Sequence, residues 1–430
     1  MVTKQNIFSL LGGFQWLFFM FANTVVIPIS IGAAFNLDGS EIVSALQQSF
    51  ILTGVACVLQ GWIGHRLSIM EGQSGLWWGV ILNIAAMADT LHLNVAAIGG
   101  SIAVGSILSG LLVSLLGVFG LAGLLKKWFT PIVMFVFLLL LANQLIFTFL
   151  KGMLGLNSGN HIRLDVACFS ILLAAITIII NIKGKGILSN LALLIGMTIG
   201  WLGSTWLFPT ELTATFTPHA HLIWFPLGAP TFIGGIVFMV VITGLLNTSN
   251  TIATLKGVED IYQKETSTKQ YKFSLILSGA FTSISGFFGL VPYAPYASSL
   301  GFLQSTGIRE RLPFFLGSVM FIILGMVPQL ISFFSTIPPH VGNTILFVAY
   351  CQLFLSALRN IEGLRFTPKT GYRIAIPSLL GMSIMNIPKE AFATIPALIQ
   401  PLLSNGLLVG ILVALLMELI SWSSKRFSNN

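Results

Sequence analysis

Apolar segments long enough to cross a bilayer recur along almost the whole sequence. A helix of about 20 apolar residues spans the hydrocarbon core, and the chain contains fourteen such segments, a few of them irregular. Only 8% of its residues are charged, against roughly 25% in an average soluble protein. The sequence therefore predicts an all-α polytopic membrane protein. The segments cover residues 7–34, 42–64, 67–88, 95–121, 128–150, 166–182, 187–208, 231–254, 273–289, 291–306, 312–337, 341–359, 374–386 and 399–422.

Lysines and arginines divide unevenly between the two sides of the predicted membrane. Cytoplasmic loops retain these residues. With the N-terminus inside, 18 of the 21 fall on the cytoplasmic side, and only Lys151, Arg163 and Lys389 fall on the other. This bias predicts a multi-pass protein of the cell (inner) membrane with both termini in the cytoplasm. The fourteen segments divide into two sets of seven. Because seven is an odd number, the second set must enter the membrane in the opposite orientation to the first, as an inverted repeat requires.

The third segment and the tenth are both interrupted by residues that disfavour a continuous helix. The third contains MEGQSG, and the tenth contains VPYAPYASSLG, in which Pro292 and Pro295 break the helix. Broken helices in equivalent positions of two halves are typical of secondary transporters, whose binding sites lie near the bilayer midplane. We expect two facing extended segments, each leading into a half-helix, to build a polar pocket there.

Glu71 is a carboxylate inside the interrupted third segment. An ionisable group at bilayer depth costs at least a few kcal/mol unless it faces a cavity or a partner, so it indicates a functional site. We expect Glu71 on the wall of the predicted pocket. The alternative is that Glu71 lies at a helix end in the membrane interface.

Several other classes of protein are disfavoured by the sequence. The net charge of +8 does not indicate a nucleic-acid-binding protein, because too little surface lies outside lipid. Cys57, Cys168 and Cys351 fall in apolar segments without a CxxC spacing, so neither a metal site, a disulfide framework nor a cofactor is predicted. The GQSG run matches the GxSG of intramembrane serine proteases, but all six histidines lie in loops or at segment ends. We therefore predict that the chain is not an enzyme.

Three motifs carry a resemblance to one transporter family. The first segment reads FQWLFFMFANTVVIP, the third EGQSG and the tenth SSLGFLQSTG. They resemble the motifs of the nucleobase-ascorbate transporter family, which includes bacterial uracil and xanthine permeases. The matching positions are Gln15, Met20, Phe21, Thr24 and Pro28 in the first motif, Gly72 and Ser74 in the third segment, and Gly301, Thr306 and Gly307 in the tenth.

The chain departs from that family at its most diagnostic positions. Trp16 replaces the usual histidine, Ser298 and Ser299 replace an acid or amide and an asparagine, and Leu246 stands at the position of a substrate-binding glutamate. Both acids that clamp the base in the family are therefore missing. We hypothesise that Glu71 has taken over either base recognition or proton coupling.

The resemblance implies two domains that move against each other. A core domain comprises residues 1–124 and 226–337, and a gate domain comprises residues 125–209 and 338–430. The resemblance also implies a homodimer in the lipid bilayer and ion-coupled uptake of a planar nitrogenous base.

We therefore predict a secondary active transporter that imports a nucleobase such as a purine, xanthine or uracil by alternating access, with a proton or a sodium ion as the coupling ion. An alternative is a transporter of the same fold that carries an inorganic or organic anion or another small solute, since half-helix N-termini suit anions. A passive channel is a third interpretation. Polar groups in membrane helices also bind neighbouring helices, which is the structural alternative for each candidate. The substrate-binding candidates are Gln15, Asn23, Glu71, Gln73, Ser74, Asn247, Asn250, Tyr296, Ser298 and Ser299.

Overall fold

The computed structural model describes most of the chain. The described residues are 4–85, 87–88, 93–121, 129–156, 161–184, 187–190, 192–208, 223–392, 394–396 and 399–427. The predicted domain limits at 1, 124, 125, 209 and 430 and the segment start at 128 lie outside them.

The described part of the chain is mainly helical, and every predicted segment contains a helix. The first half comprises α1 (Lys4–Thr24), α2 (Val26–Ala34), α3 (Gly39–Trp62), β1 (Glu71–Gln73), α4 (Gly75–Ala85), α5 (Val95–Val118), α7 (Pro131–Met153), α8 (Leu164–Lys183), α9 (Ile187–Asn190) and α10 (Ala192–Leu207). The second half comprises α11 (Gly234–Gly257), α12 (Glu259–Tyr262), α13 (Thr268–Phe287), β2 (Tyr293–Pro295), α14 (Ser298–Thr306), α15 (Arg311–Met326), α16 (Pro328–Ser335), α17 (Pro339–Asn360), α18 (Pro368–Met385), η3 (Lys389–Phe392), α19 (Gln400–Leu403) and α20 (Gly406–Phe427).

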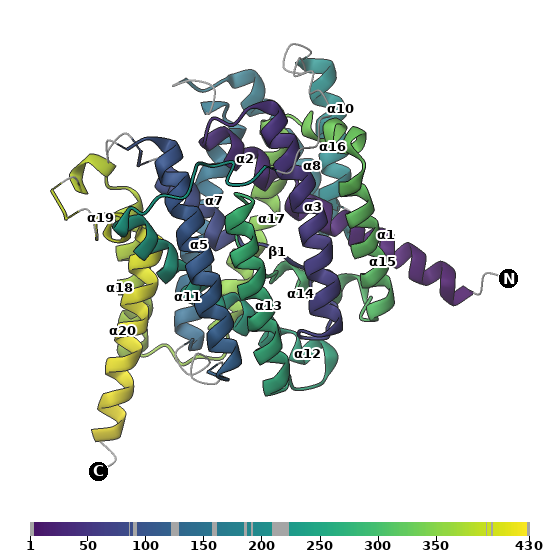
Figure 1. Cartoon of the computed structure of the whole chain (residues 1–430). Helices are drawn as coiled ribbons and strands as arrows, with labels where there is room; N and C mark the ends of the chain where they lie inside the picture. The colour runs from purple at the N-terminus through teal and green to yellow at the C-terminus, as the bar shows by residue number, and fades with distance from the viewer. Residues whose placement is uncertain are drawn as a thin grey trace.

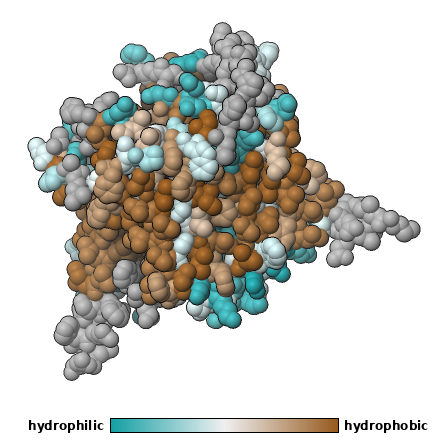
Figure 2. Space-filling view, viewed as in Figure 1, coloured by the Kyte–Doolittle hydropathy of each residue, from teal (hydrophilic) through white to brown (hydrophobic). Residues whose placement is uncertain are grey.

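The helices have the length and composition of a multi-pass membrane protein. Among the described residues, six helices are long and apolar enough to cross a bilayer, and they cover 9–34, 39–62, 95–118, 131–153, 164–183 and 234–262. Figure 2 shows a broad hydrophobic band across the middle of the visible face, with hydrophilic residues above and below it. Such a band is suited to contact with lipid, because no water is available in the bilayer core to bind polar groups.

Several segments differ from their predicted bounds, and three of these differences have clear local reasons. The first divides into α1 and α2, because Pro28 has no N–H to bond the carbonyl of Thr24. The thirteenth begins at Pro368 instead of 374, since Thr367 accepts a hydrogen bond from the Thr370 N–H and caps α18. The fourteenth divides into α19 and α20, where Asn405 Oδ1 accepts from the Leu408 N–H at 3.1 Å.

The helices pack in two sets. In one set α5 packs against α11 and α13, while α15 packs against α1 and α3. In the other set α7 packs against α17, α18 and α20, while α8 packs against α10 and α17. Figure 1 shows α18 and α20 at one edge of the molecule and α1 and α15 at the opposite edge, with β1 between them. Close approach of α5 to α13 depends on Gly110, where a Cβ would lie 2.4 Å from the Gly279 carbonyl oxygen.

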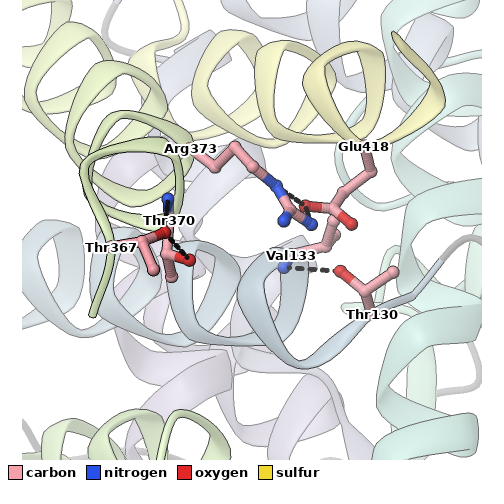
Figure 3. A network of polar contacts seen from close by, with 6 residues as sticks. All are labelled: Thr130, Val133, Thr367, Thr370, Arg373 and Glu418. Carbon is pink, nitrogen blue, oxygen red and sulfur yellow. Dashed lines mark hydrogen bonds and ion pairs between the residues drawn. The ribbon is translucent and has the colours of Figure 1, made fainter. Parts of the chain in front are cut away.

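An ion pair joins α18 to α20. Arg373 Nε donates to Glu418 Oε1 at 2.8 Å, and Arg373 Nη2 binds the same oxygen. The two side chains are 24% and 11% exposed, so the pair is largely shielded from solvent. Figure 3 shows this contact beside the caps of α7 and α18, formed by Thr130 and Thr367. A shielded pair of this kind holds the two helices in one relative position.

The extended parts of the third and tenth segments form one antiparallel ribbon at the centre of the bundle (Figure 1). Glu71 pairs with Pro295, Gly72 with Ala294 and Gln73 with Tyr293. The Ser74 N–H donates to the Pro292 carbonyl at 2.8 Å, and the Tyr296 N–H donates to the Met70 carbonyl at 2.8 Å. The ribbon thereby satisfies backbone groups that would otherwise be exposed in an apolar interior. It also places the starts of α4 and α14 close together.

Candidate functional site

A cavity lies where the ribbon and the two half-helices meet α7 and α17. Its empty space measures about 560 Å³ including the part that opens to solvent. None of the residues that line it is charged. They are Asn23, Ser74, Gly75, Leu138, Leu141, Asn250, Ala294, Pro295, Tyr296, Ala297, Ser298, Ala349 and Tyr350.

A hydrogen-bond network holds one polar wall of this cavity in place. The Ser74 hydroxyl donates to Asn247 Oδ1 at 2.7 Å, and Asn250 Nδ2 donates to Ser74 Oγ at 3.2 Å and to Asn247 Oδ1 at 2.9 Å. Asn247 Nδ2 donates in turn to the Tyr293 carbonyl at 3.1 Å. The network ties α11 to the start of α4 and to β2. Asn247 therefore supports the wall from behind, while Ser74 and Asn250 line it.

Tyr296 connects three elements around the cavity. Its hydroxyl donates to the Gln73 carbonyl at 2.5 Å and lies 3.2 Å from the Asn23 carbonyl. Its ring covers Gly72, where a Cβ would lie 2.9 Å from Tyr296 Cε2. A glycine is therefore required at this position for the ring to pack against the ribbon.

Four polar atoms of residues that line the cavity have no hydrogen-bond partner among the described residues. In the described part of the chain, no hydrogen bond engages Oδ1 of Asn23, Oδ1 of Asn250 or the hydroxyl of Tyr350. Ser298 Oγ is also buried without a partner. The amide oxygens accept hydrogen bonds, and the hydroxyls both donate and accept.

Glu71 lies on the opposite face of the ribbon from the cavity, which differs from the expected position on the pocket wall. Its side chain is fully buried. Ser278 Oγ of α13 donates to Glu71 Oε1 at 2.5 Å, and Oε2 has no partner among the described residues. Side chains alternate between the faces of a strand, so Glu71 and Gln73 share the rear face and Gly72 faces the Tyr296 ring.

Asn247 and three other predicted residues also lie outside the cavity lining. Gln73 Nε2 donates to Ser49 Oγ at 3.1 Å, and Gln73 lines a second, smaller cavity with residues such as Pro28 and Leu290. Ser299 Oγ accepts from the Met70 N–H at 3.1 Å and so positions the start of the ribbon. Gln15 is half-buried on α1, and its Oε1 has no partner.

The structure adds residues that the sequence motifs did not identify. Tyr350 lines the cavity from α17, and Gln60 and Ser278 contact the buried acid or its partner from α3 and α13. A signal for Tyr350 exists in the sequence, because it is a tyrosine in the middle of an apolar segment. Ser278 has no comparable signal, since serines recur along α13.

No metal-ligating group of three or more His, Cys, Asp or Glu side chains occurs within the described ranges. Cys57 instead bonds the ribbon, with its Sγ 3.3 Å from both the carbonyl oxygen and the N–H of Glu71.

Comparison with known proteins gives a family match over most of the chain. The model of the permease family designated Xan_ur_permease matches residues 8–390. The putative purine permease YwdJ of Bacillus subtilis is 28% identical over 98% of this chain and 97% of its own length. The xanthine permease of the same organism is 21% identical over 95% of this chain and 92% of its own length. The uric acid transporter UacT of Escherichia coli is 22% identical over 94% of this chain and 84% of its own length.

Solved structures of similar fold are transporters. The transmembrane domain of the cyanobacterial bicarbonate transporter BicA superposes with a TM-score of 0.62 at 15% identity, covering 94% of this chain and 96% of that one. The murine Solute Carrier 26 family member A9 anion transporter, in its inward-facing state, gives a TM-score of 0.62 at 11% identity, covering 97% of this chain and 68% of that one. At these identities the likeness concerns the fold alone.

Proposed function

We propose that this chain, which belongs to the permease family, carries out ion-coupled uptake of a nucleobase such as a purine, xanthine or uracil. The observation that carries this proposal is the uncharged cavity with free amide oxygens on Asn23 and Asn250 and free hydroxyls on Ser298 and Tyr350. Relatives at 21% to 28% identity whose names refer to purine, xanthine and uric acid support the choice of substrate.

The cavity wall is complementary to the edge of a planar base. Ring N–H groups of a base can donate to the amide oxygens of Asn23 and Asn250, and ring carbonyls can accept from hydroxyls. Apolar residues such as Leu138, Pro295 and Ala349 offer surface for the faces of the ring. No lysine or arginine lines the cavity, which favours a neutral ligand.

Transport in this proposal is by alternating access. The core domain (1–124 and 226–337) moves against the gate domain (125–209 and 338–430), and the chain crosses the membrane fourteen times with both termini in the cytoplasm. The division of the helices into two packed sets supports the domains. The cavity is lined by α4, α11 and α14 of the proposed core domain and by α7 and α17 of the proposed gate domain. The antiparallel ribbon supports two inverted halves, since each half supplies one strand.

Glu71 is proposed as the coupling residue, with a proton as the ion. Its carboxylate is fully buried and has one hydrogen-bond donor, Ser278, so a change in its charge would change the energy of the surrounding structure. The predicted substrate contacts Asn23, Ser74, Asn250, Tyr296 and Ser298 remain in this role. Gln15, Gln73, Asn247 and Ser299 are proposed to support them, and the protein is proposed to be a homodimer.

A competition screen in sealed vesicles tests the substrate. The screen measures uptake of labelled uracil, xanthine, urate, hypoxanthine and guanine. Each is tested with and without an excess of the other bases, and with and without a proton-dissipating agent. The proposal predicts saturable accumulation of at least one base, competition by its close analogues, and loss of accumulation when the gradient is dissipated. Absence of uptake for the whole panel would reject the substrate class.

Transport of a small anion is the second candidate. Both half-helices begin at the cavity, with Gly75 and Ser298 on its wall, and N-terminal N–H groups favour negative charge. Glu71 lies behind the ribbon and so does not oppose an anion directly. Labelled bicarbonate added to the same panel distinguishes the candidates, because a base carrier leaves bicarbonate outside.

A further inference from the structure

A cluster of polar side chains surrounds Glu71 on the rear face of the ribbon. Ser278 Oγ donates to Glu71 Oε1 at 2.5 Å, and Gln60 Nε2 donates to Ser278 Oγ at 3.1 Å and to the Ser274 carbonyl at 3.2 Å. Gln60, Glu71 and Ser274 are fully buried, and Ser278 is almost so. The cluster joins β1 to α3 and α13.

This cluster contains no cation to balance an ionised Glu71. In the part of the chain that the structure describes, no lysine, arginine or histidine lies within ion-pair distance of the carboxylate. The titratable groups that face it are Cys57 on α3 and Tyr293 on β2, whose hydroxyl lies 3.2 Å from Thr53 Oγ1. Neither carries a positive charge. An isolated buried carboxylate is costly, so the site is stable only when a positive charge, most simply a proton, joins it.

The ribbon separates this cluster from the substrate cavity. Glu71, Gln60 and Ser278 are absent from the cavity lining. Cys57 Sγ contacts the backbone of Glu71 from the rear, while the Tyr296 ring packs on Gly72 from the cavity side. A proton on Glu71 and a base in the cavity therefore cannot touch, although both contact the same short ribbon.

Hydroxyl groups extend from this cluster along the seam between α3 and α13. Ser274 and Ser278 are one helical turn apart on α13, and Ser274 Oγ is buried without a partner. The seam leads to the end of the bundle where Gln270 Nε2 donates to the His65 carbonyl at 2.5 Å. It therefore provides polar groups between Glu71 and the end of the bundle that carries Gln270 and His65, away from the cavity.

We infer that Glu71 is a proton-binding site on the rear face of the ribbon, filled and emptied separately from the base, and that the ribbon transmits its occupancy to the cavity. This inference rests on the proposed function. One proton adds to the free Oε2, converts the carboxylate to a carboxylic acid, and is released again after the conformational change; no other bond forms or breaks. Exchange of bound base across the membrane then needs no net proton movement, whereas accumulation does.

Reconstituted proteoliposomes test the inference through two readouts. Counterflow exchange of labelled base at equal pH reports binding and conformational change, and accumulation driven by an imposed pH gradient reports coupling. For Glu71→Gln, whose amide imitates the protonated acid, we expect exchange within about two-fold of wild type and accumulation reduced to the level without a gradient. Gradient-driven accumulation retained by Glu71→Gln would overturn the inference, and loss of exchange would place Glu71 in substrate binding instead.

Ser278→Ala keeps the test decisive if Glu71→Gln does not fold. This variant removes the hydroxyl that bonds the ionised carboxylate, so the half-maximum of pH-driven uptake should move toward alkaline pH by about one unit, the effect of roughly 1.4 kcal/mol. Ser285→Ala is the matched control, because that buried hydroxyl of α13 bonds only the Thr282 carbonyl. An unchanged pH dependence of uptake in Ser278→Ala, or accumulation driven by sodium in place of protons, would contradict the inference. Wild-type protein that exchanges no base would instead reject the proposed function.

Discussion

Individual residues decide what the central cavity can bind. Tyr350 offers a clear test, because its hydroxyl lines the cavity and has no partner among the described residues. We expect Tyr350→Phe to weaken base binding by about 0.5–1.5 kcal/mol, up to roughly ten-fold in Kd, while the unfolding midpoint stays unchanged. Isothermal titration of purified protein measures the affinity.

Tyr262 supplies the control for that substitution. Its hydroxyl donates to the Arg309 carbonyl at 2.8 Å, away from the cavity. Tyr262→Phe should lower the unfolding midpoint and leave Kd alone. Equal losses of affinity in both variants would mean that Tyr350 acts only through general stability.

Gly72 tests the contact between the ribbon and Tyr296. In Gly72→Ala the new Cβ would lie 2.9 Å from Tyr296 Cε2 and 3.0 Å from Met70 Cε. Because hydrogen bonds hold the Tyr296 hydroxyl, the ring cannot move freely, and overpacking costs about 1–3 kcal/mol. We expect at least a ten-fold loss of uptake at equal expression, whereas Gly371→Ala, with nothing within 4 Å of its Cβ, should transport normally.

Five of the residues predicted from the sequence line the cavity, but the sequence does not show which way each side chain faces. Asn23, Ser74, Asn250, Tyr296 and Ser298 lie on the wall, as segment depth suggests. Glu71 faces away from the cavity. The sequence does not predict this orientation, because the face of a strand residue depends on pairing and register, which single-sequence patterns do not give. Tyr350 is recognisable in the sequence as a tyrosine inside an apolar segment, but its place on the cavity wall depends on how α17 packs.

At the scale of elements, the ion pair between α18 and α20 should contribute to stability and not to binding. Arg373→Gln leaves Glu418, 11% exposed, without its partner. We expect unfolding to become easier by about 1–3 kcal/mol, between the values for surface and buried pairs. Thermal unfolding in detergent provides the measurement.

The reversed pair Arg373→Glu with Glu418→Arg separates pairing from other effects. If the ion pair is responsible, the double variant should recover part of the loss, and base affinity should equal that of wild type throughout. If the double variant loses more unfolding free energy than the two single variants lose together, helix packing and not charge decides the result.

The sequence predicts the bounds of a helix where the length of an apolar run sets them. It does not predict them where a local cap sets the end of the helix. Segment 95–121 corresponds closely to α5 (Val95–Val118), because apolar length alone sets such a helix. The two extra turns of α18 depend on Thr367 and Pro368, which lie in a polar run that hydropathy assigns to a loop. Interruptions at MEGQSG and VPYAPYASSLG were predicted, but their pairing into one ribbon depends on contacts between the two halves.

At the scale of the whole molecule, transport by alternating access requires the proposed core and gate domains to move relative to each other. Gln144 of α7 donates from Nε2 to the Gly79 carbonyl of α4 at 2.8 Å, and so joins the proposed gate domain to the proposed core domain. Gln144→Leu removes this bond and should destabilise the present arrangement by about 0.5–1.5 kcal/mol. We expect base exchange to become up to roughly ten-fold faster, with Thr148→Val as control because its bond stays within α7. Slower or unchanged exchange in Gln144→Leu would show that this contact does not restrain the motion.

The most direct measurement is an experimental structure of the protein with a nucleobase that it transports. We expect planar density in the central cavity, within hydrogen-bond distance of Asn250 and Tyr350 and out of contact with Glu71. Density for the base against Glu71 behind the ribbon, or a base bound outside the central cavity, would contradict the proposed site.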